Sequence, residues 1–297
     1  MRAQIQLLPD GRRLYLHDGP IDVILEAFGR PEAIQSAYRS ATQRFVCVLD
    51  ELCRELALLR QPYSANAPQP TGEIARRMAG AVAPYADWTF ITPMAAVAGA
   101  VAEEILRTMI LVADLERAYV NDGGDIAIFL APGEQFAVGM VERPDRPSLF
   151  GTAILDSSGP VRGIATSGWR GRSFSLGIAD AVTVLGASAS AADAAATIIA
   201  NAVDLPCHPN IQRIPACELA PDSDLGDILV TRDVGNLERV DIIAALDNGE
   251  AMAKKLLEKK LICAAALHLR GETRVIDTSS GAERPHSSNG HWSLVNA

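Results

Sequence analysis

The sequence predicts an α+β fold in which antiparallel sheets pack against helices. Strand and helix patterns come in blocks rather than in strict alternation, which favours this class over α/β. The chain begins with a strand pair and continues into a long apolar stripe at helical spacing. Of its 297 residues, 48% are hydrophobic and 21% are charged, as in a globular protein with a substantial core.

The first residues predict a β-hairpin. The segments "QIQLL" and "RRLYLH" alternate apolar and polar side chains, and Pro9-Asp10-Gly11 joins them. Proline, aspartate and glycine in this order are typical of a tight turn between strands.

Residues 31–59 are predicted to form a helix. Its apolar residues recur at spacings of three and four: Ile34, Ala37, Tyr38, Ala41, Phe45, Val48, Leu49 and Leu52. These spacings place them on one face of a helix. We interpret Cys47 and Cys53 as packing residues of that helix.

The remaining elements follow from the same patterns. A proline-containing loop at 61–72 precedes a short helix at 73–83, and a second helix begins at Pro93. Small side chains at 95–102 leave room there for another backbone or a ligand. Strands are predicted near 117–121, 125–130, 135–141, 149–155, 162–166, 180–186, 227–231, 262–269 and 273–278. Helices are predicted at 190–203 and 237–260, with a loop at 205–216. We expect one domain over 1–280 and a polar tail over 281–297.

Charge and cysteine usage exclude several classes. The net charge of −9 and the pI near 5.1 argue against nonspecific binding to nucleic acid or to anionic membranes. Five cysteines without a CxxC pattern suggest neither a disulfide framework nor a zinc ribbon. No signal peptide is visible, and the longest apolar stretch, 94–113, contains charged residues. We therefore expect a cytoplasmic protein.

The segment "NDGGDI", residues 121–126, connects two predicted strands. Gly123 and Gly124 can both adopt positive φ, and neither carries a side chain that would block an anion. Asp125 can bind ribose hydroxyls, orient a metal or stabilise the turn itself. The segment therefore fits a hairpin turn and also fits a nucleotide site.

The segment "GIATSG", residues 163–168, ends a predicted strand on hydroxyl groups. Thr166, Ser167 and Gly168 can offer hydroxyls and backbone amides to a phosphate, and a solvated turn is the alternative. Three cations accompany the segment: Arg162, Arg170 and Arg172.

Asp193 and Thr197 lie four residues apart on a predicted helix and so share one face. Both supply the hard oxygen ligands that magnesium prefers, with phosphates and waters filling the other positions. The alternative is structural, because Ser190-x-x-Asp193 is an acidic capping-box pattern and Thr197 can bond back within the helix.

In this order, these segments resemble the ApbE-like superfamily, whose known enzymes are FAD-dependent flavin transferases. "VNDGGDI", "VGMVERP", "GIATSG" and "AVTVLGASASAADAAATIIANAV" are similar to successive family segments, and "PMAAVAGAVAEEI" stands where the family has a Lys-Gly-Tyr-Ala helix. The resemblance runs from about 93 to 205 and is closer to a smaller, soluble, poorly characterised branch. It implies a T-fold-type architecture of two related ββααββ units.

The resemblance also implies a site. Mg²⁺ would bind Asp193, Thr197 and a carbonyl near Ala98. FAD would contact residues from three segments: Gly99, Asn121, Gly123, Gly124, Asp125, Thr166, Ser167 and Gly168. In the family, FAD is split, FMN passes to a protein hydroxyl and AMP leaves. The nearby candidates for a catalytic role are Asp180, Arg170 and Arg172.

Two departures from the family pattern widen the choice of function. Where the family has His-Ile-Ile-Asp-Pro-x-Thr-Gly, this chain has "GRSFSLGIAD", in which Asp180 is the only acid. Where the family has Lys-Gly-Tyr, this chain has Ala98-Gly99-Ala100. Nucleotide or metal binding is favoured over flavin transfer to an unknown protein acceptor. Three hypotheses stay open: an FAD- and Mg²⁺-dependent transferase or pyrophosphatase, a non-catalytic flavin or anionic-metabolite binder, and a structural homo-oligomeric homologue.

Overall fold

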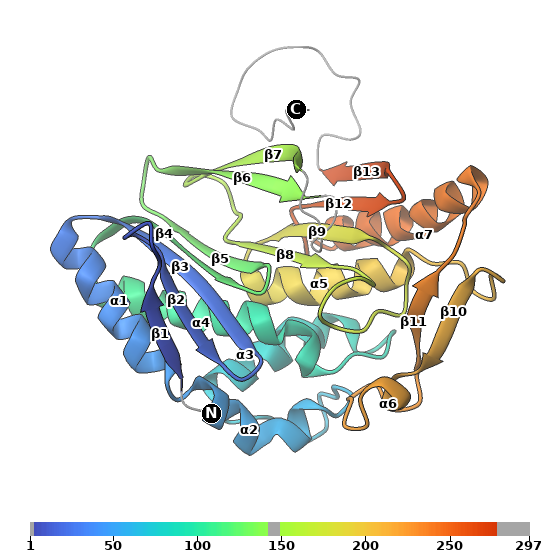
Figure 1. Cartoon of the computed structure of the whole chain (residues 1–297), viewed down its shortest axis with the longest axis horizontal. Coiled ribbons are helices and arrows are strands. Elements are labelled where there is room, and N and C mark those ends of the chain that lie inside the picture. Colours follow the sequence, from blue (N-terminus) through green and yellow to red (C-terminus); the bar gives the residue numbers. More distant parts are fainter. Residues whose placement is uncertain (1–2, 142–148, 278–297) are drawn as a thin grey trace, which may run out of the picture. The chain divides into compact units, whose positions relative to one another are not determined.

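The structure, a computed structural model, describes residues 3–141 and 149–277 and divides the chain into two units (Figure 1). Unit 1 comprises residues 1–135, 156–165 and 186–194, and unit 2 comprises 136–155, 166–185 and 195–297. The chain passes between the units within five elements: β6 (Gln135–Val141), β7 (Leu149–Asp156), β8 (Gly163–Ser167), β9 (Ala181–Gly186) and α5 (Ala189–Ala202). The predicted tail, 281–297, lies outside the described residues, and the single domain over 1–280 stays a prediction.

Unit 1 is built on antiparallel strands. They are β1 (Gln4–Leu7), β2 (Leu14–Asp18), β3 (Ile21–Gly29), β4 (Leu115–Asp122) and β5 (Asp125–Leu130), in the order β1-β2-β3-β4-β5 with the start of β8 beside β5. Burial alternates along β2 and β4, so that one face of the sheet is apolar. The N-terminal hairpin is confirmed as β1 and β2, which pair antiparallel.

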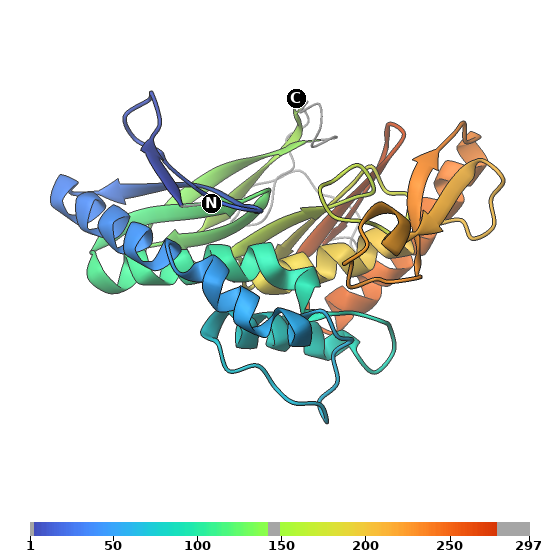
Figure 2. The same ribbon diagram turned by 60° about the horizontal axis from the view of Figure 1, so that its bottom comes forward.

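Helices cover the apolar face of the unit 1 sheet (Figure 2). The helices next to the sheet are α1 (Pro31–Phe45) and α4 (Val97–Val112), while α2 (Val48–Leu59) and α3 (Glu73–Val82) pack on other helices. The unit also contains the 3-10 turns η1 (Ala83–Tyr85) and η2 (Pro93–Ala96). Helix α1 packs on β3 and α4, while α4 packs on β4 and β5. The core between these layers includes fully buried Leu16, Leu25, Phe45 and Ile105.

The single helix predicted over 31–59 is wrong, because the chain breaks it at residues 46–47. The carbonyl of Arg44 accepts the Cys47 amide at 3.4 Å and the Cys47 thiol at 3.1 Å, a tight turn that ends α1. The apolar spacing continues from Phe45 to Val48, so the letters do not show the break. The packing role of Cys47 and Cys53 is also wrong, since both side chains are exposed.

Unit 2 also combines antiparallel strands with helices. Its elements are β6 (Gln135–Val141), β7 (Leu149–Asp156), β10 (Ile211–Pro215), α6 (Ala216–Leu219), β11 (Leu229–Val234), α7 (Arg239–Glu258), β12 (Ala264–Leu269) and β13 (Glu272–Asp277), together with parts of β8, β9 and α5. The strand order is β8-β9-β12-β13, and α7 packs on β12 and β13. The predicted loop at 205–216 is wrong in part, because 211–215 pairs with β11.

The predicted α+β class is confirmed by this mixture of helices and antiparallel sheet. In each unit two strand pairs are separated by a segment that contains helices: β2-β3 and β4-β5 in unit 1, and β8-β9 and β12-β13 in unit 2, where the segment also contains the pair β10-β11. That the two units are related repeats stays a prediction.

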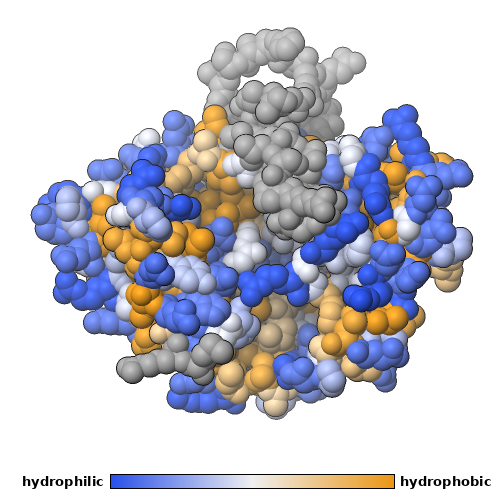
Figure 3. All heavy atoms as spheres, in the orientation of Figure 1, coloured by the Kyte–Doolittle hydropathy of each residue, from blue (hydrophilic) through white to orange (hydrophobic). Residues whose placement is uncertain are grey.

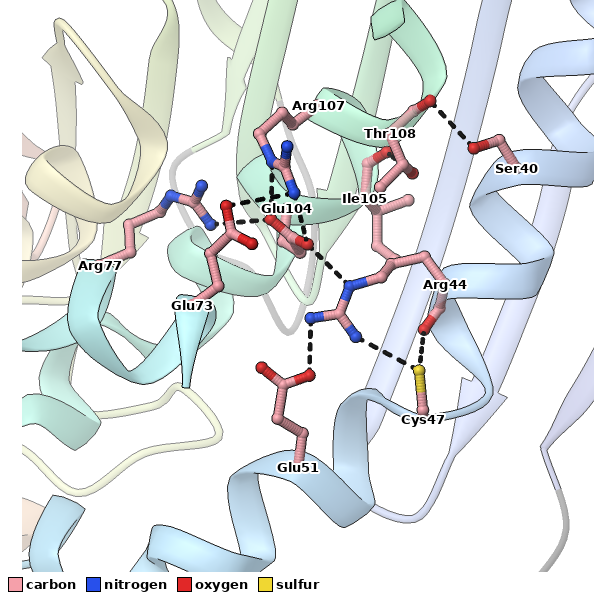
Figure 4. A network of polar contacts seen from close by, with 10 residues as sticks. All are labelled: Ser40, Arg44, Cys47, Glu51, Glu73, Arg77, Glu104, Ile105, Arg107 and Thr108. Atoms are coloured by element: carbon pink, nitrogen blue, oxygen red, sulfur yellow. Dashed lines mark hydrogen bonds and ion pairs between the residues drawn. The ribbon is translucent and has the colours of Figure 1, made fainter. Parts of the chain in front are cut away.

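A buried carboxylate, Glu104, organises the helices of unit 1 (Figure 4). Its side chain is 1% exposed and bonds Arg44 at 2.7 Å, Arg107 at 3.0 Å and Arg77 at 3.2 Å. Burial by itself raises the pKa of Glu104, but the hydrogen bonds and charges of Arg107 and Arg44 outweigh it, so the pKa lies below its ordinary value of 4.5. Glu104 therefore joins α1, α3 and α4 as an anion.

Hydrophilic residues cover most of the surface drawn in Figure 3, interrupted by smaller apolar patches. Over the ranges 3–141 and 149–277, none of the helices combines the length and the apolar character needed to cross a membrane.

We expect Glu104→Gln to destabilise the protein by about 1.5–3 kcal/mol, because it weakens charge-assisted hydrogen bonds from arginines whose side chains are 16–38% exposed. Urea unfolding followed by circular dichroism measures the change. The matched control is Glu51→Gln. Of the network's arginines, the Glu51 carboxylate bonds only Arg44, and its side chain is 24% exposed. A loss for Glu51→Gln as large as for Glu104→Gln would contradict the central role of Glu104.

The stability should also depend on pH through Glu104. Because its folded-state pKa is lowered, its contribution is fully present above pH 4.5 and is lost as the pH falls through the folded-state value. The unfolding free energy of the wild type should therefore fall more steeply below pH 4.5 than that of Glu104→Gln. Parallel pH profiles for the two proteins would argue against this.

Candidate functional site

The segment "NDGGDI" forms the hairpin turn between β4 and β5. Asp122 pairs with Asp125, and Gly123 and Gly124 make the turn with φ of +63° and +118°. The Gly124 amide donates to Asn121 Oδ1 at 2.8 Å, and the Gly123 amide donates to the Asp22 carbonyl at 3.2 Å. The turn interpretation is confirmed. A Cβ at Gly124 would meet no atom within 4 Å, so the backbone there is open to close approach.

Asp122 is the acidic residue of this turn that the sequence interpretation left out. It is 5% exposed and shares the buried side of β4 with Val120 and Ala118. Its Oδ1 accepts the Asp22 amide at 3.2 Å. The signal was present in the sequence, because Asp122 continues the alternation of buried residues along the strand. An acid on the apolar face of a strand is uncommon and merits a functional hypothesis.

Asp193 reaches out of α5 to the first turn of α4. The N-cap residue of α4 is Ala96, which has no side-chain acceptor for the unpaired amides of that turn. Asp193 Oδ2 supplies the acceptor and takes the Gly99 amide at 3.0 Å. The structural alternative, a capping box from Ser190 to Asp193, is wrong. The residue immediately before α5 is Ser188 and not Ser190, and the Ser188 hydroxyl accepts the Ala191 amide at 3.3 Å.

The pKa of Asp193 connects the helix terminus to the Gly-Gly turn. Burial raises this pKa to about 7, and the like charge of Asp122 adds to the rise, while the amides of Gly99 and Ala98 oppose it. Asp122 acts on Asp193 because unit 1 brings the hairpin turn and the start of α5 to the α4 N-terminus. The negative charge of Asp122 therefore disfavours the ionised form of Asp193, and a nearby cation would relieve this repulsion.

Glycine allows the backbones around Asp193 to come unusually close. A Cβ on Gly99 would lie 2.4 Å from the Ala189 carbonyl oxygen, and a Cβ on Gly163 would lie 2.1 Å from the Ser188 carbonyl carbon. Among the small residues at 95–102, Gly99 therefore allows another backbone segment to approach α4. The steric cost of a side chain at this point explains a glycine in the first turn of α4, where alanine has the higher helix propensity.

The other predicted metal ligands lie on the same two helices. Thr197 is half-buried one turn after Asp193 on α5. Ala98 lies in the first turn of α4 and turns its amide toward Asp193. Within 3–141 and 149–277, no group of three or more His, Cys, Asp or Glu side chains is arranged to hold a metal. Metal ligation by Thr197 and by the Ala98 carbonyl stays a prediction.

In unit 2, the segment Thr166-Ser167-Gly168 is held by close backbone packing. The Thr166 hydroxyl lies 3.0 Å from the Thr183 hydroxyl, and a Cβ on Gly168 would lie 2.5 Å from the Asp180 carbonyl oxygen. Gly168 is thus required where two chain segments touch. Its binding of a flavin, with Thr166 and Ser167, stays a prediction.

Asp180, one of the three predicted catalytic residues, is 4% exposed and accepts several donors. They are the Arg270 amide at 2.7 Å, Trp169 Nε1 at 3.3 Å and Arg170 Nε at 3.3 Å. The Arg170 guanidinium also stacks on the Trp169 ring at 4.1 Å. These contacts give Asp180 and Arg170 a structural role in the loop between β8 and β9, and their part in catalysis stays a prediction.

The other two arginines near the Thr-Ser-Gly segment differ in their environment. Arg172 is exposed. Arg162 donates to the carbonyls of Ser157, Gly159 and Val161, so it stabilises the turn that precedes β8. The expectation of three cations gathered for an anion therefore does not hold for Arg162.

Fold and site together define an α+β protein whose first unit sets a carboxylate pair beside a helix N-terminus and a Gly-Gly hairpin turn. The chain belongs to the family described as AbpE bacteria, whose model matches residues 5–275. Membership confirms the predicted relationship to ApbE-like proteins.

The chain is also similar to curated archaeal proteins. It is 33% identical over 186 residues to a UPF0280 protein of Methanopyrus kandleri, covering 61% of this chain and 69% of the relative. A UPF0280 protein of Archaeoglobus fulgidus is 37% identical over 175 residues, 56% of this chain and 66% of the relative. One from Methanosarcina barkeri is 34% identical over 149 residues, 50% and 55% of the two chains. The chain thus spans from about half to two thirds of these relatives' length.

Among solved structures, the chain is similar to the apo form of the flavinyl transferase ApbE of Pseudomonas stutzeri. The sequence identity is 10%, the match covers 94% of this chain and 95% of that one, and the TM-score is 0.45.

We expect Gly99→Ala to destabilise the protein by about 1–3 kcal/mol, because the added methyl group meets a backbone carbonyl that cannot move aside. The control is Gly80→Ala on α3, where a Cβ meets no atom within 4 Å. That change should stabilise by about 0.5–1 kcal/mol through helix propensity alone. Denaturant unfolding distinguishes the two, and a neutral Gly99→Ala would contradict the close approach.

Proposed function

We propose that this protein binds FAD or a related nucleotide together with Mg²⁺ and cleaves the pyrophosphate, with transfer of FMN to a protein hydroxyl as the form the family resemblance implies. The observation that supports this best is the Asp193 carboxylate, held by α4 amides and raised in pKa by burial and by Asp122. Such a carboxylate is poised to bind a cation rather than to remain a lone buried charge.

The residues present fit a magnesium ion. Its preferred ligands are hard oxygens, and Asp193, Asp122 and the Thr197 hydroxyl are of this kind. Repulsion between Asp122 and Asp193, which contributes to the raised pKa, would be relieved by a divalent cation. When bound, Mg²⁺ neutralises phosphate charge and orients the leaving group.

The chain's own groups would prepare the site. The Gly99 amide holds Oδ2 of Asp193 and the Ala98 amide also donates to this carboxylate, so the first turn of α4 fixes the orientation of the side chain. The Gly123-Gly124 turn carries no side chains, and the space beside Gly124 admits a phosphate or ribose close to the backbone.

A second candidate is a protein that binds flavin without cleaving it. The specific observation for it is the loop after Gly168, whose single acid, Asp180, already accepts three donors. A carboxylate saturated in this way has little capacity left to act as a base. Binding alone would show as FAD affinity in calorimetry that persists in EDTA without release of AMP.

We expect wild-type protein incubated with FAD and Mg²⁺ to release AMP, and Asp193→Asn to lower the rate at least about tenfold, since loss of a direct ligand should cost no less than loss of an outer contact. The control is Asp114→Asn, whose carboxylate is 92% exposed. Chromatography of AMP and FMN gives the rates. If wild type releases no AMP and calorimetry detects neither FAD nor Mg²⁺, the proposal is wrong.

A further inference from the structure

Helices α4 and α5 each supply a carboxylate to the first turn of the other. Asp193 of α5 accepts the Gly99 amide of α4 at 3.0 Å. In return, Glu103 Oε1 of α4 accepts both the Ser190 amide, at 2.6 Å, and the Ser190 hydroxyl, at 2.7 Å. All four residues belong to unit 1. The two contacts form a reciprocal pair between the helix starts.

The spacing of the pair restricts how α5 can sit on α4. Gly99 and Glu103 are four residues apart on α4, and Ser190 and Asp193 are three apart on α5, so each pair lies on one face of its helix. Two contacts about one turn apart oppose both rotation and sliding of α5. The Gly99 backbone packs closely against the backbone at Ala189, so α5 cannot move nearer to α4.

Glu103 is itself held in place from the other side. Its Oε2 pairs with Arg77 Nε at 3.0 Å, while Arg77 Nη1 pairs with Glu104 at 3.2 Å. Glu104 is the buried centre of the arginine network, so Arg77 links Glu103 to the best-anchored charge in unit 1. Both oxygens of Glu103 are thus engaged, one by α5 and one by Arg77.

We propose that Glu103 is a positioning residue for the cation site: it fixes the first turn of α5, and through it the direction in which Asp193 presents its carboxylate. This inference rests on the proposed function for its consequence in catalysis. Loss of the Glu103 carboxylate would leave the Ser190 amide without its acceptor and let the start of α5 shift. Groups that orient a metal ligand typically change metal affinity by about 10–100-fold when removed.

The test compares Glu103→Ala, Glu103→Gln and Glu51→Ala in the full chain. For Glu103→Ala we expect the Mg²⁺ concentration at half-maximal AMP release to rise about tenfold or more, with kcat changed less. Glu103→Gln retains an oxygen that accepts from Ser190 and should stay within about threefold of wild type. Glu51→Ala removes a carboxylate of the same arginine network that does not touch α5, and its Mg²⁺ dependence should match wild type.

A second measurement separates this inference from the proposed function. In metal-free protein, the NMR shift of the Gly99 amide proton reports its bond to Asp193, with Asp193→Asn as the reference for a weakened bond. Glu103→Ala should move this resonance toward the reference, whereas Glu103→Gln should not. The milder Ser190→Ala, which removes only the hydroxyl, should give a smaller shift in the same direction and serves if Glu103→Ala folds poorly.

The outcomes are distinct. Absence of AMP release and of Mg²⁺ binding in wild type would defeat the proposed function, yet the Gly99 resonance would still test the positioning role. An unchanged Gly99 resonance in both Glu103→Ala and Ser190→Ala would overturn that role. So would an unchanged Mg²⁺ dependence in an active Glu103→Ala protein.

Discussion

The candidate site depends on one close approach, that of the first turn of α4 to the backbone at the start of α5. A Cβ on Gly99 would lie 2.4 Å from the Ala189 carbonyl oxygen, so no other residue fits without displacing a helix. At this short range Asp193 reaches the Gly99 amide and Glu103 reaches Ser190. If the helices moved apart by even the width of a methyl group, both bonds would lengthen beyond useful range.

Electrostatics explains why acidic side chains occupy these positions. A helix N-terminus carries unpaired amides and a partial positive charge, which stabilise a nearby carboxylate. At α5 the carboxylate of Glu103 is further balanced by Arg77. At α4 the carboxylate of Asp193 accepts backbone amides, and Asp122 adds negative charge beside it. The two ends thus differ: the carboxylate at α5 is paired with an arginine, whereas the carboxylate at α4 is repelled by a second carboxylate, which is the basis of the proposed cation site.

Several elements could be predicted from the sequence because their signals are local. The Gly123-Gly124 turn follows from residues that adopt positive φ, and its two interpretations proved compatible, since an open turn is also accessible to a ligand. The break after Phe45 could not be predicted, because the apolar spacing runs through it. The exposure of Cys47 could not be predicted for the same reason, because Cys47 lies at this break. The strand at 211–215 was hidden by prolines and depends on pairing with β11.

The sequence by itself determined the α+β class, most element positions and the family relationship, because periodicity, turn residues and ordered motifs can be recognised from residues that are close together in the sequence. Only the tertiary structure decided the partners of the charged groups. Asp193 bonds a residue 94 positions away, and Glu103 bonds one 87 positions away. Within its own helix, the Ser190-x-x-Asp193 pattern predicted a different role for Asp193. Which of the two bonds forms depends on which backbone segments the glycines allow to approach. Long-range packing of this kind leaves no local signature.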